Sequence, residues 1–188
     1  MSQKFLFVTG NKHKLEEVQK ALPDFTISGE KIDLPEIQGW DVENIVRMKV
    51  LEACRQLQCP VIVDDTSVYI EAFNGFPGPY AADWQKVVGN ERTLQLLRGF
   101  KKRNASMVCR AAYCEPGQEP VIFEGKVEGF IATQIRGKEG FGFDPIFIPE
   151  GKVNTFGEMS LEEKNESNHR ARAFSKLAKY LREMYHNL

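Results

Sequence analysis

The chain has 188 residues, with 25 basic and 26 acidic side chains and a formal net charge of −1. This length predicts one ordinary domain, residues 1–188, and the balanced charge argues against a bulk nucleic-acid binder. No apolar run is long enough for a membrane span or a signal peptide, so we expect a cytoplasmic protein without nucleic-acid or membrane partners.

Hydrophobic periodicity predicts strands and helices in mixed order. In chain order, the predicted elements are a strand at 5–8, a helix at 12–22, a helix at 42–57, a strand at 61–63 that ends on "DDT", a turn-rich loop at 74–80, a helix capped by Asn90, strands at 106–114 and 121–132, and a helical segment that opens at Ser160 with the capping box "SLEE". No repeat or linker interrupts this pattern, which predicts one α/β domain.

The first polar cluster is a loop between the first strand and the first helix. A turn of this kind can direct backbone N–H groups and a lysine at a phosphate, although "TGN..K" matches neither a P-loop nor a dinucleotide fingerprint. By itself, the cluster is also typical of a plain turn with a solvated basic face. Its candidate residues are Thr9, Gly10, Asn11, Lys12, His13 and Lys14.

A second cluster, Asp64-Asp65-Thr66, follows an apolar strand. Carboxylates at the carboxyl end of a strand lie where open α/β sheets bind ligands, and they can hold Mg²⁺ or accept a proton from water. The alternative is a turn in which an aspartate caps the next segment. Glu36, in "DLPEIQG", would not be singled out on its own.

Two further clusters lie toward the C-terminus. In "GFGFDPIF", Phe141 and Phe143 would face the same way in an extended chain, with room beside Gly142, and can form a wall for a flat base next to Asp144. The alternative is aromatic packing in a core strand. In "EEKNESNHRARAF", three hydrogen-bond donors lie within two helical turns; they are Lys164, His169 and Arg170. The alternative is a charged helix face exposed to solvent.

The cysteines are spaced in two pairs, 54/59 and 109/114, which raises the question of a four-cysteine zinc site. Five residues turn a helix by about 140°, and an odd separation in a strand places side chains on opposite faces. Both pairs would therefore diverge, and we prefer buried free thiols.

These motifs, in this order, resemble the inosine triphosphate pyrophosphatase family, also called the Ham type. The resemblance runs from about Lys4 to about Leu181 and is carried by "TGNKHKLEE", "DLPEIQG", "IVDDT", "NGFPGPY", "GFGFDPIFIPEG" and "EEKNESNHRARAF". It implies an elongated α/β fold whose twisted mixed sheet is flanked by helices, with two lobes around a cleft. It also implies a homodimer and a Mg²⁺-dependent enzyme that hydrolyses non-standard purine nucleoside triphosphates (ITP, dITP, XTP) to a monophosphate and pyrophosphate.

The resemblance also implies roles for individual residues. Phosphate contacts would come from the loop at 9–14 and from Lys49, and Thr66 would touch substrate. Glu36 and Asp65 would bind the metal, and Asp65 would also activate the water. The base would be held by Phe141, Gly142, Phe143 and Asp144, and its edge would be read by Lys164, His169 and Arg170.

This reading predicts that Arg170→Ala lowers activity on ITP far more than activity on ATP. Hypoxanthine presents an acceptor at C6 where adenine presents an amino donor, so buried donors distinguish the two bases. One departure from the family pattern is Asn168, where Ser is usual. The alternative function is a nucleotide-binding regulatory protein with weak catalysis.

Overall fold

The computed structural model describes residues 4–35, 37–166 and 168–185. Its helices are α1 (Lys12–Ala21), α2 (Val42–Leu57), α3 (Ala81–Val87), α4 (Gly89–Leu96), α5 (Leu161–Asn165) and α6 (His169–Tyr185), with short 3₁₀ helices η1 (Glu71–Phe73), η2 (Asp144–Ile146) and η3 (Phe156–Glu158). Its strands are β1 (Lys4–Val8), β2 (Thr26–Glu30), β3 (Val61–Ile70), β4 (Pro77–Gly78), β5 (Asn104–Cys114), β6 (Val121–Ile131) and β7 (Phe147–Pro149). The α/β class predicted from the sequence is confirmed.

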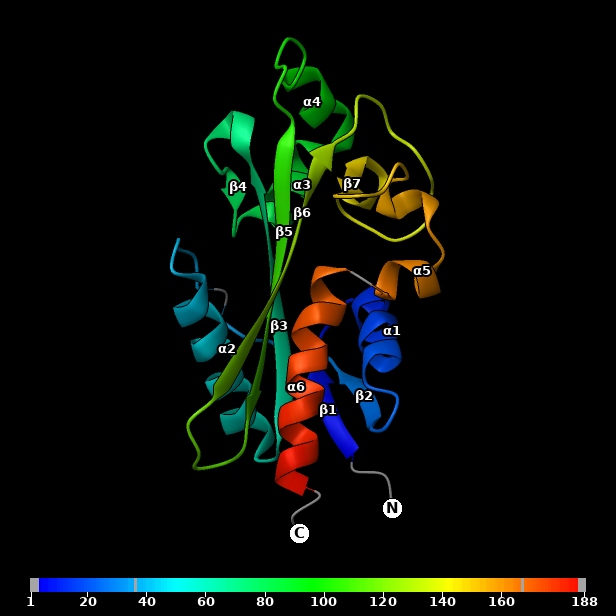
Figure 1. The fold of residues 1–188 in the computed structure, drawn as a ribbon. Coiled ribbons are helices and arrows are strands. Elements are labelled where there is room, and N and C mark those ends of the chain that lie inside the picture. Colours follow the sequence, from blue (N-terminus) through cyan, green and yellow to red (C-terminus); the bar gives the residue numbers. More distant parts are fainter. Residues whose placement is uncertain (1–3, 36, 167, 186–188) are drawn as a thin grey trace. The chain divides into compact units, whose positions relative to one another are not determined.

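The described strands form a mixed sheet in the order β2-β1-β3-β5-β6-β7, with β4 paired to β3 (Figure 1). β1 runs parallel to both β2 and β3, whereas β4 is antiparallel to β3 and β7 is antiparallel to β6. No helix in the described part of the chain is long and apolar enough to cross a membrane.

The chain divides into two compact units, and β3, β5 and β6 contribute to both. The first unit contains residues up to 65, 109–125 and those from 169 onward, and the second contains 66–108 and 126–168. Each unit has its own hydrophobic core.

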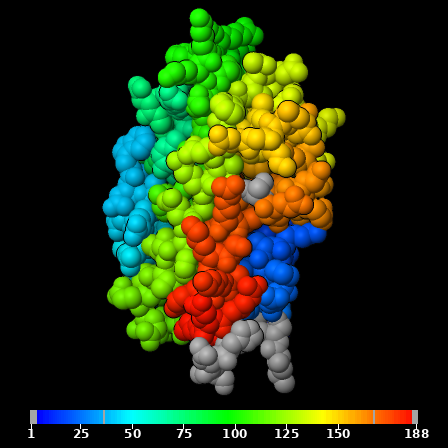
Figure 2. Space-filling view, viewed as in Figure 1, coloured from blue at the N-terminus to red at the C-terminus, as the bar shows by residue number. Residues whose placement is uncertain are grey.

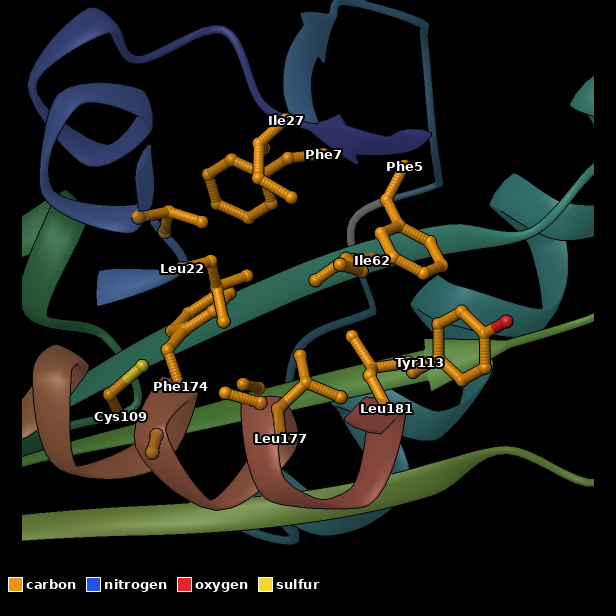
Figure 3. Packing of buried hydrophobic residues seen from close by; sticks show 14 residues of the cluster. Phe5, Phe7, Leu22, Ile27, Ile62, Cys109, Tyr113, Phe174, Leu177 and Leu181 are labelled. Atoms are coloured by element: carbon orange, nitrogen blue, oxygen red, sulfur yellow. The ribbon is translucent and has the colours of Figure 1, made fainter. Parts of the chain in front are cut away.

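The first unit packs helices on both faces of its strands. One core contains Phe7 of β1, Ile62 of β3 and Phe174 of α6, and α1 and α6 cover it (Figure 3). The opposite core contains Val63 of β3 and Val50 of α2. Successive strand residues face opposite sides, so α1 and α6 lie on one side of β3 and α2 on the other (Figure 1). Figure 2 shows α6 beside α1 at the surface of this unit.

The second unit has an aromatic core between its part of the sheet and the loops that follow β6. Phe147 of β7 stacks on Phe156 of η3 with ring centroids 5.4 Å apart. Phe143 lies in the same core and is 3% exposed. These contacts hold the segment from 140 to 147 against the strands.

The largest departure from the predicted elements is β3. The sequence predicts a strand that ends on "DDT", but β3 continues from Val61 through both aspartates to Ile70. The apolar alternation resumes at Val68 and Ile70, both buried, and β4 pairs with this extension. The aspartates therefore lie in the middle of a strand and not at its carboxyl end.

Two of the predicted helix starts can be compared with the structure. The capping box at Ser160 is confirmed, because the Ser160 side chain accepts a hydrogen bond from the Glu163 amide. The prediction for Asn90 is wrong: Asn90 lies inside α4, whose N-cap is Val88. Its amide group instead accepts a bond from Gln85 and donates one to the carbonyl of Gly142.

Candidate active site

The loop after β1 is organised by Asn11, the N-cap of α1. The Asn11 side chain accepts hydrogen bonds from the amides of His13 (3.0 Å) and Lys14 (3.3 Å). The Thr9 hydroxyl in turn accepts a bond from the Asn11 amide at 3.1 Å. A cap of this kind satisfies orphan N–H groups of the first turn, and here it also sets the direction in which Lys14 leaves the helix.

Asp64 joins the lysines of two different helices. Its carboxylate accepts a bond from Lys14 Nζ of α1 at 2.9 Å, and its backbone carbonyl accepts one from Lys49 Nζ of α2, also at 2.9 Å. Asp64 itself is buried, at 1% exposure. The two amines that the sequence assigns to phosphate are therefore anchored by one residue of β3.

A buried ion pair supports Asp64 from the other side. Arg170, at the start of α6, donates from Nε to the Asp64 carboxylate at 2.9 Å and from Nη1 to Glu17 of α1 at 2.5 Å. Arg170 is fully buried, and Glu17 is 2% exposed. Removing one member of such a group would leave a charge uncompensated in the core, which is costly.

Charge rather than burial decides the ionisation of Asp64. Burial by itself would raise the pKa of this carboxyl, but the positive charges of Lys14, Arg170 and Lys49 outweigh burial and hold the pKa well below its ordinary value. Asp64 thus remains an ionised carboxylate that is held by the cations around it. This arrangement suits an anchor better than a group that must exchange protons.

Asp65 has different surroundings, although it is the next residue. It is partly exposed, and its side chain makes no hydrogen bond or ion pair with the described residues. Burial raises its pKa, and the nearby charges of Lys49 and Lys14 oppose that rise only in part. A reachable carboxylate beside two lysines, with no partner among the described residues, is suited to binding a cation or to accepting a proton from water.

The donor set fits Mg²⁺ in part. Mg²⁺ sites in phosphate-transfer enzymes often use one or two carboxylates together with phosphate oxygens and water, and Asp65 offers one such carboxylate. The second ligand suggested by the resemblance, Glu36, lies outside the described residues. Within the described ranges, no three acidic, histidine or cysteine side chains converge as a ready metal site.

The second unit holds a separate cluster around Asp144. The Asp144 carboxylate accepts a bond from the Phe141 amide at 2.7 Å and pairs with Lys164 Nζ of α5 at 2.7 Å, and both charged side chains are buried. Gly140 has φ +73°, and a Cβ there would overlap the Asp144 carboxylate. Glycine is therefore required for this turn to close on Asp144.

The two phenylalanines of this segment are not equivalent. The segment is not extended as the sequence suggests, because Phe143 has helical backbone angles and η2 follows it. Phe143 packs in the core, whereas Phe141 is partly exposed with Lys164 Nζ 5.2 Å from its ring centroid. Of the two phenylalanines, Phe141 is therefore the one that is partly exposed.

The structure groups the sequence-derived candidates into two sets. The first unit brings together the residues around Asp64, namely Thr9, Asn11, Lys14, Lys49, Asp65 and Arg170, whereas Gly10, Lys12 and His13 are exposed. The second unit brings together Phe141, Asp144 and Lys164, and it also contains Gly142 and Thr66. His169 is buried at the start of α6. The sequence groups Arg170 with Lys164, but the Arg170 side chain contacts Asp64 and Glu17.

Sequence reasoning did not assign roles to Glu17 or Arg110. Glu17 looks like one acid on a solvated helix, yet it lies one turn after Lys14 and so faces the same side of α1. Arg110 belongs to no recognisable motif. The one sequence signal for the direction of its side chain is strand alternation, which places Arg110 on the opposite face from Cys109.

The cysteines are free thiols, as preferred from the sequence, but Cys59 is only partly buried. Cys109 lies 3.8 Å from the Asp64 carboxylate, and Cys114 lies in the core under α2. The expected divergence of these two side chains is thus confirmed. Burial raises the pKa of Cys109 well above the ordinary thiol value, so it does not contribute a thiolate to this site.

Lysines held beside a reachable carboxylate are groups with which an enzyme can bind a phosphoryl group and activate water. The model of the Ham1 family matches residues 5–180, and the chain belongs to that family.

Named relatives extend over nearly the whole chain. A dITP/XTP pyrophosphatase of Methanopyrus kandleri is 45% identical over 94% of this chain and 95% of its own length. An inosine triphosphate pyrophosphatase of Batrachochytrium dendrobatidis is 42% identical over 92% of this chain and 91% of its own. The solved structure of a HAM1 protein from Coxiella burnetii has a TM-score of 0.83 and 31% identity, covering 96% of this chain and 99% of that one.

Proposed function

We propose that the protein is a Mg²⁺-dependent pyrophosphatase of non-standard purine nucleoside triphosphates, which removes ITP, dITP and XTP from the nucleotide pool. Water would attack the α-phosphorus, and the products would be the nucleoside monophosphate and pyrophosphate. The observation that carries this proposal is the pair of lysines held 2.9 Å from Asp64, next to the reachable carboxylate of Asp65. The names of the relatives support the same class of substrate.

We assign the phosphates to the first unit. A triphosphate carries about four negative charges, and Lys14 and Lys49 offset part of them at fixed positions. The Asn11 cap holds the start of α1 in place, so the helix dipole also favours the anion. Asp65 accepts the proton of the attacking water. Mg²⁺, when bound by Asp65 and Glu36, would offset further phosphate charge and favour formation of the nucleophile.

We assign the purine to Phe141, Asp144 and Lys164. The face of Phe141 stacks on a ring without regard to its identity, so selection depends on hydrogen bonds at the base edge. Lys164 is a buried donor held by Asp144. A donor suits the C6 oxygen of hypoxanthine or xanthine and leaves adenine with an unpaired contact, which disfavours ATP.

The test is a panel of nucleoside triphosphates with Mg²⁺ and separate detection of pyrophosphate and orthophosphate. We expect pyrophosphate release from ITP, dITP and XTP at kcat/KM at least about 10²-fold above ATP. Chelation by EDTA should abolish turnover, and added Mg²⁺ should restore it. Binding of ITP without turnover would favour a regulatory nucleotide-binding protein instead.

The resemblance also leads us to propose a homodimer that acts in the cytoplasm, where free nucleotides accumulate. Sedimentation velocity over a hundredfold range of protein concentration tests the assembly. A single species with the mass of one 21.4 kDa chain at all concentrations would contradict the dimer.

A further inference from the structure

Arg110 of β5 lies on the same face of the sheet as Asp65. On β5, Cys109 faces α1 and α6, so the next residue, Arg110, faces α2, as Ala112 does. On β3, Val63 also faces α2, and Asp65, two residues later, shares that side. Arg110 and Asp65 therefore face the side from which α2 presents Lys49.

The Arg110 guanidinium lies on the same side of the sheet as the Asp65 carboxylate. The side chain is 20% exposed, so most of it is enclosed. Arg110 is thus a further cation beside the carboxylate to which we assign the proton transfer.

Only part of the Arg110 guanidinium is used within the protein. Nη2 donates to Glu124 of β6 at 2.6 Å, and Glu124 is about half exposed. Nη1 is buried and has no hydrogen-bond partner among the residues that the structure describes. Buried polar atoms nearly always have partners, so an unpaired donor beside a reactive carboxylate requires an explanation.

The neighbouring amines differ from Arg110 in this respect. Lys14 donates to the Asp64 carboxylate, and Lys49 donates to the Asp64 carbonyl. Arg110 Nη1 has no acceptor among the described residues, and it belongs to a guanidinium that stays charged at all relevant pH values.

We propose that Arg110 is a substrate-binding residue whose Nη1 donates to a non-bridging oxygen of the nucleotide's phosphates. This inference rests on the proposed function for the identity of the anion. Because Nη2 pairs with Glu124, Nη1 is the donor that is left for the phosphate. Arg110 thereby adds a third cation to the phosphate site, on the side of the sheet from which α2 presents Lys49.

The experiment compares Arg110→Gln, Arg110→Lys and Glu124→Gln with the wild type. It also includes the exchanged pair Arg110→Glu/Glu124→Arg, which keeps an ion pair between β5 and β6 but moves the cation. Binding of inorganic pyrophosphate with Mg²⁺ is measured by titration calorimetry, kcat and KM are measured with ITP, and the Tm of each variant is measured by calorimetry.

We expect Arg110→Gln to weaken pyrophosphate binding and raise KM by roughly 10- to 150-fold, the loss typical of a charged hydrogen bond. Arg110→Lys should recover part of the affinity, and Glu124→Gln should stay within about threefold of the wild type. The exchanged pair should bind at least as weakly as Arg110→Gln, because a glutamate at position 110 also repels pyrophosphate. The Tm of the exchanged pair should stay near that of the wild type.

Equal losses in Arg110→Gln and Glu124→Gln, or recovery of affinity in the exchanged pair, would overturn the proposal, because either would mean that the ion pair matters and not the donor. Unchanged pyrophosphate affinity in Arg110→Gln would overturn it as well. Failure of the proposed function is a separate outcome: the wild type would hydrolyse no nucleotide, whereas the calorimetric comparison would still report on Arg110.

Discussion

Asp64 and Asp65 are neighbours on β3, and their different surroundings divide the work of the site. Asp64 is buried and holds Lys14, Lys49 and Arg170 in place. Asp65 faces the α2 side, is reachable and has no direct partner among the described residues. Strand alternation produces this division, since consecutive residues must face opposite sides. We infer that Asp64 organises the site and that Asp65 carries out the proton transfer.

This division predicts distinct effects of Asp65→Asn and Asp64→Asn. Asp65→Asn should lower kcat for ITP by roughly 10²- to 10⁴-fold with little change in Tm, because it removes a base that supports no other side chain. Asp64→Asn should lower Tm clearly, because it removes the carboxylate that pairs with Lys14 and one of the two carboxylates that pair with Arg170. Steady-state kinetics at saturating Mg²⁺ and thermal unfolding measure both effects. Unchanged turnover in Asp65→Asn would reassign the base.

Arg170 provides a second test at the level of single residues. Reasoning from the sequence predicts that Arg170→Ala lowers kcat/KM for ITP far more than for ATP. The contacts of Arg170 with Asp64 and Glu17 favour another result: a loss of about 3–5 kcal/mol of stability, with activity on both nucleotides falling together. The ITP-to-ATP ratio of kcat/KM decides between these two outcomes. A ratio that falls tenfold or more at unchanged Tm would show that Arg170 recognises the base.

Among the elements, α1 begins at an N-cap, Asn11, to which we assign both a structural and a binding role. Asn11→Asp keeps the acceptor that caps α1, so its stability should remain within about 0.5 kcal/mol of the wild type. The added negative charge would face the phosphates and should raise KM for ITP roughly tenfold. Asn11→Ala is the matched control, with a loss of about 1 kcal/mol of stability. Equal KM values for Asn11→Asp and the wild type would limit Asn11 to capping.

The packing of α6 on β6 depends on Gly125. A Cβ at Gly125 would overlap backbone atoms of His169 and Ala173, so α6 would have to move away from the strand. Gly125→Ala should therefore cost about 1–3 kcal/mol of unfolding free energy. It should also lower kcat, because α6 carries Arg170. Gly39→Ala, where nothing lies within 4 Å of the added Cβ, is the control for urea unfolding. Equal unfolding midpoints for the two variants would contradict this account.

For the molecule as a whole, local patterns predicted the elements better than the contacts between them. Helical periodicity located α2 at its observed bounds, because a helix is defined by residues close in sequence. The predicted end of β3 was wrong, because the continuation of this strand depends on pairing with β4. Likewise, the bonds from Arg170 to Asp64 and Glu17 span 106 and 153 residues, and no local pattern reports them.

The last prediction concerns the bond that the whole enzyme breaks. Lys14 and Lys49 are anchored to the same residue, Asp64, so they can offset charge close to the carboxylate of Asp65. This arrangement favours attack at the phosphorus next to Asp65 and departure of the remaining phosphates as one unit. In ¹⁸O-water, we therefore expect label in the nucleoside monophosphate and none in pyrophosphate during a single turnover on ITP. A matched reaction with added unlabelled pyrophosphate controls for exchange. Label in pyrophosphate, or orthophosphate as the first product, would place the attack at another phosphorus.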